Sequence, residues 1–437
     1  MTALQALTWA ATAGVMALLI GYGVGAPWLL FRTIHTVGKR RRLRYRPADD
    51  RVLATSRFTI PVSLILTLTE ETVDPAGSVR RLLDIRYPDA ELIVVTNGAP
   101  VALDVLRREF DLNPCELFFR RTLRTANPGV IYRSSSQPRL LVAETLGGPE
   151  GDALNCGVNL ARYRYVCVAE PDTDYDRDGL LEAMQVATED PAHVVGVTTS
   201  LRPAVNPGAG TSTRVGIAAA LTCLAAARMR LLTIARRRLD LPPGGHPGFR
   251  IWRRDVIVEV GGFSHAPASI HADMTFRVHR HFAGNRQRYR LLHLSSTVGA
   301  VRISASAATG VRAGFVPWSV VWAHRAMAFN YRLGRLGLVD YPAYVLALIA
   351  APWLELLALV LLAAALPLGV LAPADLLLVL GVIGFGSGIV AAAALLLSGD
   401  ALPDRRPATL LTLILVGPFE YFLTRPPLLG SRLTGRR

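Results

Sequence analysis

The stretch VAEPDTDYDRDG, residues 168–179, holds the side chains best suited to binding a cation. It includes the end of the apolar run YRYVCV and carries an acid at every second position from Glu170 to Asp178. Carboxylates at positions i and i+2 at the end of a strand point the same way, so Glu170 and Asp172 suit one divalent ion held against a diphosphate. Pro171 between them keeps Glu170 extended and stiffens the turn.

Two other interpretations of this stretch are open. Residues 174–179, DYDRDG, match the first half of a calcium-binding loop, but Gln185 stands at the twelfth position, where a bidentate Glu is needed. A strand, and not a helix, is also expected before that loop. The remaining interpretation is a solvated turn in which Asp178 caps the next helix, since Asp is a good N-cap and its charge suits a helix N-terminus.

Short apolar runs alternate with amphipathic stretches in the middle of the chain. The runs are PVSLILTL (61–68), ELIVVT (91–96), LLVAE (140–144) and YRYVCVA (163–169). This alternation is typical of an α/β fold with a parallel sheet that helices cover on both faces. Ligands of such sheets bind beyond the carboxyl ends of the strands. We therefore expect Glu70, Glu71, Asn97 and the acidic run to share one rim of the sheet.

Both ends of the chain are predicted to cross a membrane. Residues 1–31 carry no charged side chain and are long enough to span ~30 Å of hydrocarbon. The basic linker 32–51 follows, and the positive-inside bias places it in the cytoplasm. Residues 339–437 contain two or three further spans, at 341–367, 374–397 and, for the shorter third candidate, 408–424. The sequence thus predicts a multi-pass protein of the cytoplasmic membrane.

Two regions lie between these spans. Residues 52–310 form the predicted α/β domain, which this topology places in the cytosol. Residues 311–338 are predicted to be an amphipathic interface helix region on the bilayer surface, with Trp318 and Trp322 one turn apart. The arginines of the basic linker suit contact with anionic lipid headgroups. The chain of 437 residues has a net charge of +15, and we expect no nucleic-acid partner. The four cysteines are far apart, which argues against a disulfide framework or a structural zinc site.

Residues 58 to 338 resemble the membrane-bound family 2 glycosyltransferases, the cellulose- and hyaluronan-synthase-like group. The resemblance rests on the order and spacing of FTIPVSLIL, SVRRLLDIRYPDAELIVV, DALNCGVNLARYRYVCVAEPDTD, RRDVIVEVGGF, ADMTFRVHRH and HRAMAFNYRLGRLGL. It implies a cytosolic GT-A (Rossmann-like) domain, a nucleotide-diphosphate sugar donor such as a UDP-sugar, and a divalent metal, Mn or Mg. It also implies a glycan acceptor and other polysaccharide-synthesis proteins as partners.

The resemblance carries over to the donor site with substitutions. TNGA stands where the family has Asp-Asp-Gly-Ser, so Asn97 takes the place of an acid near the nucleobase. The lysine that precedes DALN in the family is missing, and Lys39 is the single lysine of this chain. Two acids are also predicted to bind the donor: Glu70, on the expected rim, and Asp152, in DALN.

The metal and acceptor positions are partly kept. The Asp-x-Asp of the family becomes EPD (170–172), in which the resemblance assigns Asp172 to the metal and Glu170 to the donor side. The Glu-Asp of the acceptor site becomes AD (272–273), with Asp273 as the implied general base. Gln-Arg-x-Arg-Trp aligns with TGVRA (309–313), so Arg312 keeps one donor-binding cation while the tryptophan is lost.

Alternatives stay open at this point. Asp273 also suits a solvated acid that caps a helix. His271, His279 and His281 have a mixed spacing that does not place all three on one helical face, so we interpret them as solvated or phosphate-facing and not as a metal site. Two functions follow: a divergent inverting glycosyltransferase, or a pseudo-glycosyltransferase that acts as a membrane scaffold or regulator of a polysaccharide synthase.

Overall fold

The structure is a computed structural model that describes residues 59–125, 128–171, 173–205, 247–265, 269–303, 316 and 318–346, with isolated residues between 9 and 31 and between 357 and 386. The predicted membrane spans and the basic linker lie largely outside these residues. Within the described part, no helix combines the length and the apolar character needed to cross a bilayer.

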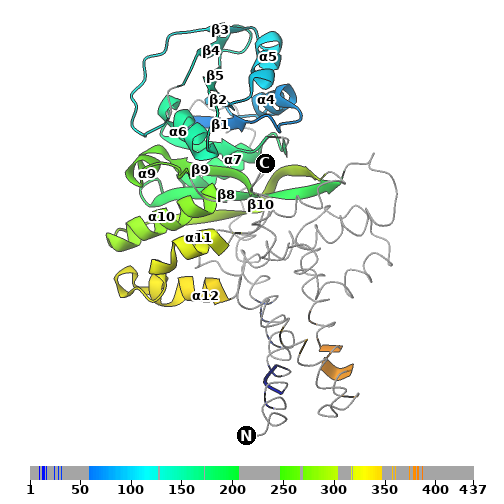
Figure 1. Cartoon of the computed structure of the whole chain (residues 1–437), viewed down its shortest axis with the longest axis vertical. Coiled ribbons are helices and arrows are strands. Elements are labelled where there is room, and N and C mark those ends of the chain that lie inside the picture. Colours follow the sequence, from blue (N-terminus) through cyan, green and yellow to red (C-terminus); the bar gives the residue numbers. More distant parts are fainter. Residues whose placement is uncertain are drawn as a thin grey trace.

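The described residues build a ten-stranded sheet in the order β3-β4-β5-β2-β1-β6-β9-β8-β10-β7 (Figure 1). Its central part is parallel, because β1 pairs with β2 and β6, and β2 pairs with β5. These four strands are β1 (Val62–Leu68), β2 (Ala90–Asn97), β5 (Leu140–Thr145) and β6 (Tyr165–Ala169). Each agrees closely with one of the four apolar runs, so the α/β prediction is confirmed for this part.

The sheet as a whole is mixed, so the expected parallel arrangement holds for the central strands and not for the whole sheet. The remaining strands are β3 (Leu112–Pro114), β4 (Ile131–Ser134), β7 (Thr173–Tyr175), β8 (Val194–Val205), β9 (Pro247–Arg253) and β10 (Arg290–Ile303). β9 is antiparallel to both neighbours, β6 and β8. The first residues of β9 therefore reach the rim at which the parallel strands end.

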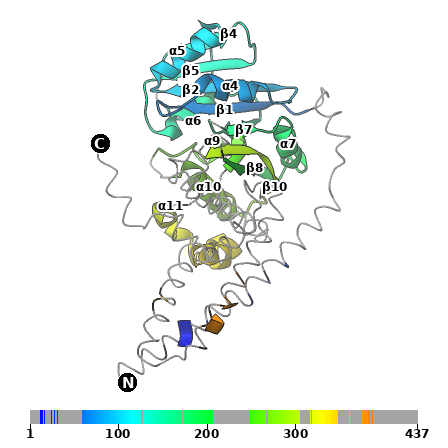
Figure 2. The same cartoon turned by 90° about the vertical axis from the view of Figure 1, so that its right-hand side faces the viewer.

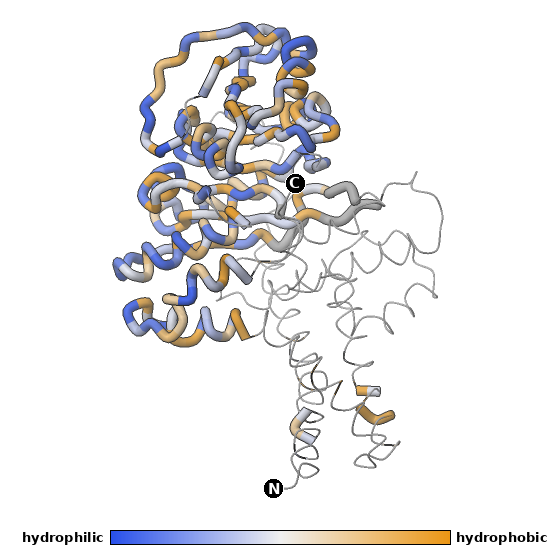
Figure 3. Tube along the Cα trace, viewed as in Figure 1, coloured by the Kyte–Doolittle hydropathy of each residue, from blue (hydrophilic) through white to orange (hydrophobic). Residues whose placement is uncertain are grey.

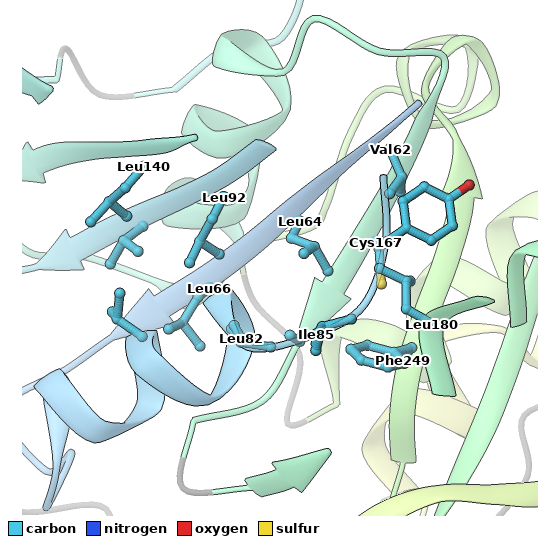
Figure 4. Packing of buried hydrophobic residues seen from close by; sticks show 14 of the residues in the cluster. Val62, Leu64, Leu66, Leu82, Ile85, Leu92, Leu140, Cys167, Leu180 and Phe249 are labelled. Carbon is cyan, nitrogen blue, oxygen red and sulfur yellow. The ribbon is translucent and has the colours of Figure 1, made fainter. Parts of the chain in front are cut away.

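Helices cover both faces of the sheet, as the sequence predicted. On one face α4 (Pro75–Leu83), α5 (Pro100–Glu109) and α7 (Gly179–Thr188) pack in a cluster with Leu64 and Leu66 of β1 (Figure 4). On the other face α6 (Glu150–Leu160), α9 (Arg254–Glu259) and α10 (Ile270–Gly284) pack in a cluster with Ile65. Successive side chains of a strand point to opposite faces, which explains this division.

Local sequence signals set where two of these helices begin. Asp74 is the N-cap of α4, and its Oδ1 accepts a hydrogen bond from the amide of Gly77 at 2.8 Å. Pro75 and Pro100 stand in the first turns of α4 and α5. Proline is favoured there because the amide it lacks would have no partner within the helix.

The region expected to hold one amphipathic helix is instead a run of short helices in its described part. These are α11 (Trp318–Ala323), 3-10 turns at Arg325–Met327 and Tyr331–Leu333, and a π-helical turn at Leu336–Asp340 that crosses the expected boundary at 338. α12 (Tyr341–Val345) follows, at the start of the predicted span 341–367. Phe329 and Gly334 have φ angles of 56° and 58°, which a continuous α-helix does not allow. We call residues 318–346 the interface segment.

α10 lies between the sheet and the interface segment, and Figure 1 and Figure 2 both show α11 next to it. Ile270, Met274 and Val278 belong to the cluster against the sheet, whereas Ala272 and Phe276 pack with the interface segment. Hydrophilic and hydrophobic residues accordingly alternate along α10 in Figure 3. This packing fixes the first turn of α10, which carries two of the polar side chains described below.

Candidate active site

Arg250 and Glu170 form an ion pair at the rim where β6 ends. Because β9 runs antiparallel to β6, with Arg250 opposite Val168, the guanidinium reaches the residue that follows β6. Nη1 of Arg250 donates a hydrogen bond to Oε1 of Glu170 at 2.7 Å. The arginine side chain is 9% exposed and the glutamate side chain 35%, so the pair opens to solvent on the side of Glu170. No described residue hydrogen-bonds the second carboxylate oxygen, Oε2.

His271, in the first turn of α10, approaches the same carboxylate. Its Nε2 lies 3.9 Å from Oε1 of Glu170. Both ring nitrogens are buried and make no hydrogen bond within the described part of the chain. Burial, and secondly the positive charge of Arg250, hold the pKa of His271 well below its usual value. The imidazole is therefore neutral, with one donor and one acceptor nitrogen for a polar ligand.

Glu150, at the start of α6, adds a second acid to this group. Although the residue is exposed as a whole, its pKa is raised, first by burial of its carboxyl and then by the charge of Glu170, while Arg250 lowers it. The nearby like charge of Glu170 thus disfavours the ionised form of Glu150. Among the described residues, no three His, Cys, Asp or Glu side chains are grouped so as to hold a metal ion. Asp172, the predicted metal ligand, lies outside these residues.

The acidic run continues as a strand and not as a calcium loop. Thr173–Tyr175 form β7, which pairs antiparallel with β10 where a calcium loop needs a continuous turn. The hydroxyl of Tyr175 accepts a hydrogen bond from the amide of Glu170 at 2.8 Å, and its ring stacks on Phe249 with centroids 4.2 Å apart. Asp178 stands at the N-cap position of α7, as expected, but its side chain makes no capping hydrogen bond.

Asp273 forms a second polar group, two residues along α10 from His271. Its Oδ1 accepts a hydrogen bond from Nε2 of His324 at 2.8 Å, and both side chains are buried. Oδ2 is also buried and has no hydrogen-bond partner in the described part, since Nη1 of Arg277 is 3.7 Å away. Ser269 is the N-cap of this helix, so Asp273 is neither a cap nor a solvated acid. A buried acceptor without a partner is rare in proteins and calls for an explanation.

The three histidines of α10 have three different environments. Nδ1 of His279 lies 2.7 Å from the hydroxyl of Tyr289, and this histidine is buried. Nε2 of His281 lies 3.0 Å from Oε1 of Glu259, near the surface. Since His271 faces Glu170, the three side chains do not converge on one metal ion. His279 is thus buried and not solvated, whereas the interpretation of His271 as phosphate-facing stays a prediction.

Asn97 holds two loops of the rim together. Its Nδ2 donates to the carbonyl of Gly148 at 2.8 Å, and its Oδ1 accepts from the hydroxyl of Thr145 at 3.2 Å. Gly98 and Gly147 have positive φ angles and approach so closely that a Cβ on Gly98 would lie 2.9 Å from Cα of Gly147. Asn97 is thus part of the loop structure, and its contact with a nucleobase stays a prediction.

The other predicted donor residues are more scattered. Glu70 is exposed in the turn after β1. Oδ1 of Asp152, in the first turn of α6, lies 3.4 Å from Nδ1 of His265. Arg312, the predicted diphosphate-binding cation, lies outside the described residues, as Asp172 does. The structure therefore brings Glu170 together with Arg250 of β9 and His271 of α10. The roles of the other residues stay predictions: Glu70, Asp152, Asp172 and Arg312.

Sequence analysis missed three residues of these groups. Arg250 stands alone as a charge in the apolar run GFRIW (248–252), which was a usable signal. Glu150 lies in GGPEGDALN (147–155), where the lysine of the family is missing. His324 belongs to HRAMAFN, and nothing in the sequence alone joins it to Asp273, 51 positions away.

The fold is similar to that of a solved glycosyltransferase. The mannosyltransferase PcManGT from Pyrobaculum calidifontis, in complex with GDP-Man and Mn²⁺, matches with a TM-score of 0.55 and 16% identity over 94% of this chain and 97% of its own. Residues 1–349 of S. aureus TarS match at 11% identity over 86% of this chain and 92% of theirs, with a TM-score of 0.39 that is too low to support an argument. Compared by sequence, the chain matches no protein-family profile and no curated protein. The likeness thus shows a GT-A-like fold.

Proposed function

We propose that the chain is a divergent membrane glycosyltransferase of the family 2 type. It transfers a sugar from a nucleotide-diphosphate sugar to a cell-surface glycan with inversion at the anomeric carbon. The observation that carries this proposal is the buried carboxylate of Asp273, with Oδ1 held by His324 and Oδ2 without a hydrogen-bond partner in the described part. A carboxylate that is oriented through one oxygen, while the other oxygen makes no hydrogen bond, suits a general base.

In the proposed reaction Oδ2 of Asp273 takes the proton of an acceptor hydroxyl. The acceptor oxygen forms a bond to the anomeric carbon while the bond from that carbon to the diphosphate oxygen breaks, and the nucleoside diphosphate leaves with the electron pair. Arg250, together with Arg312 as a predicted second cation, stabilises the negative charge that grows on the diphosphate. Attack on the side opposite the leaving group inverts the anomeric carbon.

A divalent ion fits the acidic side of the site. Oε2 of Glu170 has no hydrogen-bond partner among the described residues, and carboxylate oxygens are preferred ligands of Mg²⁺ and Mn²⁺. Glu170 and Asp172 would hold the ion. When bound, such an ion neutralises charge on the diphosphate. The complex of PcManGT with GDP-Man and Mn²⁺ supports this donor class and cofactor for a chain of similar fold.

Contact with the lipid bilayer is also part of the proposal. Trp318 and Trp322 are 39% and 54% exposed on the interface segment, with ring centroids 5.8 Å apart. The guanidinium of Arg325 lies 5.1 Å from the centre of the Trp322 ring. Exposed indole rings beside arginine suit the interface between headgroups and hydrocarbon. Together with the predicted spans, this surface supports a catalytic domain that lies at the cytosolic face of the cytoplasmic membrane.

A second candidate function is a pseudo-glycosyltransferase that serves as a membrane scaffold or regulator of a polysaccharide synthase. Two observations favour it. The side chain of Asn97 is used to hold loops where the family has an acid for the nucleobase. Glu150 brings negative charge to the group around Glu170, near the expected place of an anionic diphosphate. A scaffold of this kind requires neither nucleotide binding nor a base.

Nucleotide binding by the detergent-purified chain distinguishes the two functions. Titration calorimetry with UDP and with GDP, each with and without Mn²⁺, should show metal-dependent binding of one of them that Glu170→Gln weakens about tenfold or more. Asp255→Asn, at an exposed acid paired with Arg253, is the matched control. Absence of binding of UDP, GDP and other nucleotides at millimolar concentration would contradict the transferase and favour the scaffold.

A further inference from the structure

His324 belongs to the interface segment and not to the sheet domain that carries Asp273. It follows α11, where its amide donates to the carbonyls of Val320 and Val321. The hydroxyl of Tyr341 donates to the carbonyl of Val321 at 2.8 Å, which ties α12 to the same turn. His324 itself is 5% exposed. These hydrogen bonds fix the backbone from which the imidazole of His324 extends.

We propose that His324 is a positioning residue for Asp273, which holds the carboxylate so that Oδ2 faces the acceptor hydroxyl. This inference rests on the proposed function. A carboxylate accepts hydrogen bonds, so the proton of the 2.8 Å contact lies on Nε2 of His324. That single hydrogen bond occupies Oδ1 and leaves Oδ2 as the oxygen that can take a proton.

Arg277 shows why such a restraint is needed. Its Nη1 donates to the carbonyl of Gly262 at 2.6 Å, and its Nη2 bonds the carbonyl of Val260, so the guanidinium is held 3.7 Å from Oδ2 of Asp273. A carboxylate released from His324 can rotate to form a closer ion pair with Arg277. An opposite charge in contact favours the ionised carboxylate and makes it a weaker base.

The surroundings of His324 restrict its movement as well. The Phe276 ring, from α10, lies 5.1 Å from the imidazole centroid. Phe276 also makes edge contacts with Tyr341 and Tyr344 of α12, with centroids 5.6 and 5.8 Å apart. The base is thus oriented by a residue whose own place depends on aromatic packing between α10 and the interface segment. Catalytic groups held by packed neighbours keep the short-range geometry that transfer requires.

Substitution of His324 separates positioning from simple folding. His324→Leu removes the hydrogen bond, and we expect kcat of sugar transfer to fall on the order of 10²-fold while the Kd for the nucleotide stays within about twofold. In His324→Gln the side-chain amide nitrogen can take the place of Nε2, so this variant should keep kcat within about tenfold of wild type. The side-chain amide of His324→Asn is too short to reach Oδ1 of Asp273, so this variant should resemble His324→Leu. If His324→Leu does not fold, His324→Asn takes its place in the test.

His279→Leu is the matched control, because it removes a buried histidine of α10 whose Nδ1 contacts the hydroxyl of Tyr289. It should lower thermal stability without a comparable loss of kcat. A wild-type kcat in both His324→Leu and His324→Asn would overturn the positioning role of His324 but not the proposed function. An equal loss of kcat in His279→Leu would do the same. Failure of the wild-type chain to transfer sugar from any nucleotide sugar would instead overturn the proposed function, and this inference with it.

Discussion

Oδ1 of Asp273 and Nε2 of His324 lie 2.8 Å apart, although 51 positions separate the two residues in the sequence. The contact joins α10, which packs on the sheet, to the interface segment, which carries the exposed Trp318 and Trp322. A carboxylate at this junction is buried yet keeps one oxygen without a partner in the described part. This combination is the reason for assigning the base to Asp273.

Arg250 should contribute to donor affinity. We expect Arg250→Met to raise the Kd for the nucleoside diphosphate about tenfold, because it removes a cation from the rim and leaves Glu170 without its ion-pair partner. Arg253→Met, on the same strand but paired with Asp255, should leave the Kd unchanged in titration calorimetry. Equal affinities for all three proteins would show that Arg250 does not face the donor.

Asn97 should resist replacement by the acid that the family has there. Asn97→Asp loses the hydrogen bond to the carbonyl of Gly148 and turns a carboxylate oxygen toward that carbonyl. We expect a loss of about 1–2 kcal/mol in stability and no gain in nucleotide affinity. Asn97→Ala serves as the matched variant in thermal unfolding and calorimetry. A tenfold lower Kd of Asn97→Asp for the nucleotide would mean that position 97 does face the nucleobase.

The buried thiols should be unreactive at pH 8. Burial, with a smaller effect of Asp152, raises the pKa of Cys156 to about 11, and burial raises the pKa of Cys167 above its usual value as well. At pH 8 both are thus protonated, and labelling by a maleimide in a Cys223→Ser background should be confined to the partly exposed Cys115. Raising the pH to 9 should not make Cys156 or Cys167 react with the maleimide. Rapid labelling of Cys156 would contradict the packing of α6 on the sheet.

Trp318 and Trp322 should meet the bilayer. In liposomes that contain lipids brominated near the headgroup, Trp318→Phe/Trp322→Phe should lose part of the fluorescence quenching that the wild-type chain shows. Trp252→Phe, which removes a buried indole of the sheet domain, should keep that quenching. Retention of the full quenching by the double variant would place the interface segment away from the lipid.

Most of the parallel half of the fold could be predicted from local pattern. The runs that became β1, β2, β5 and β6 are short, apolar and flanked by amphipathic stretches, so their periodicity alone identifies them. Antiparallel β9 has no such signal, because its place between β6 and β8 depends on pairing with residues far away in the sequence. The same is true of the short β7, which looked like a turn.

The candidate site was predictable to a smaller extent. Glu170 and Asp273 were identified as residue types at family positions, but their partners came from other elements. Arg250 depends on the direction of β9, and His324 depends on packing of the interface segment against α10. Sequence periodicity describes one element at a time, so contacts between elements lie beyond it. For the same reason the burial of His271 was not expected.

Asp273→Asn is the most direct test of the account. The initial rate of transfer from a labelled nucleotide sugar and the Kd for the same nucleotide should be measured in wild type, Asp273→Asn and the surface control Asp255→Asn. Loss of the base should lower the rate on the order of 10³-fold or more, with the Kd and the control unchanged. Transfer by Asp273→Asn at the wild-type rate would contradict the assignment of Asp273 as the general base.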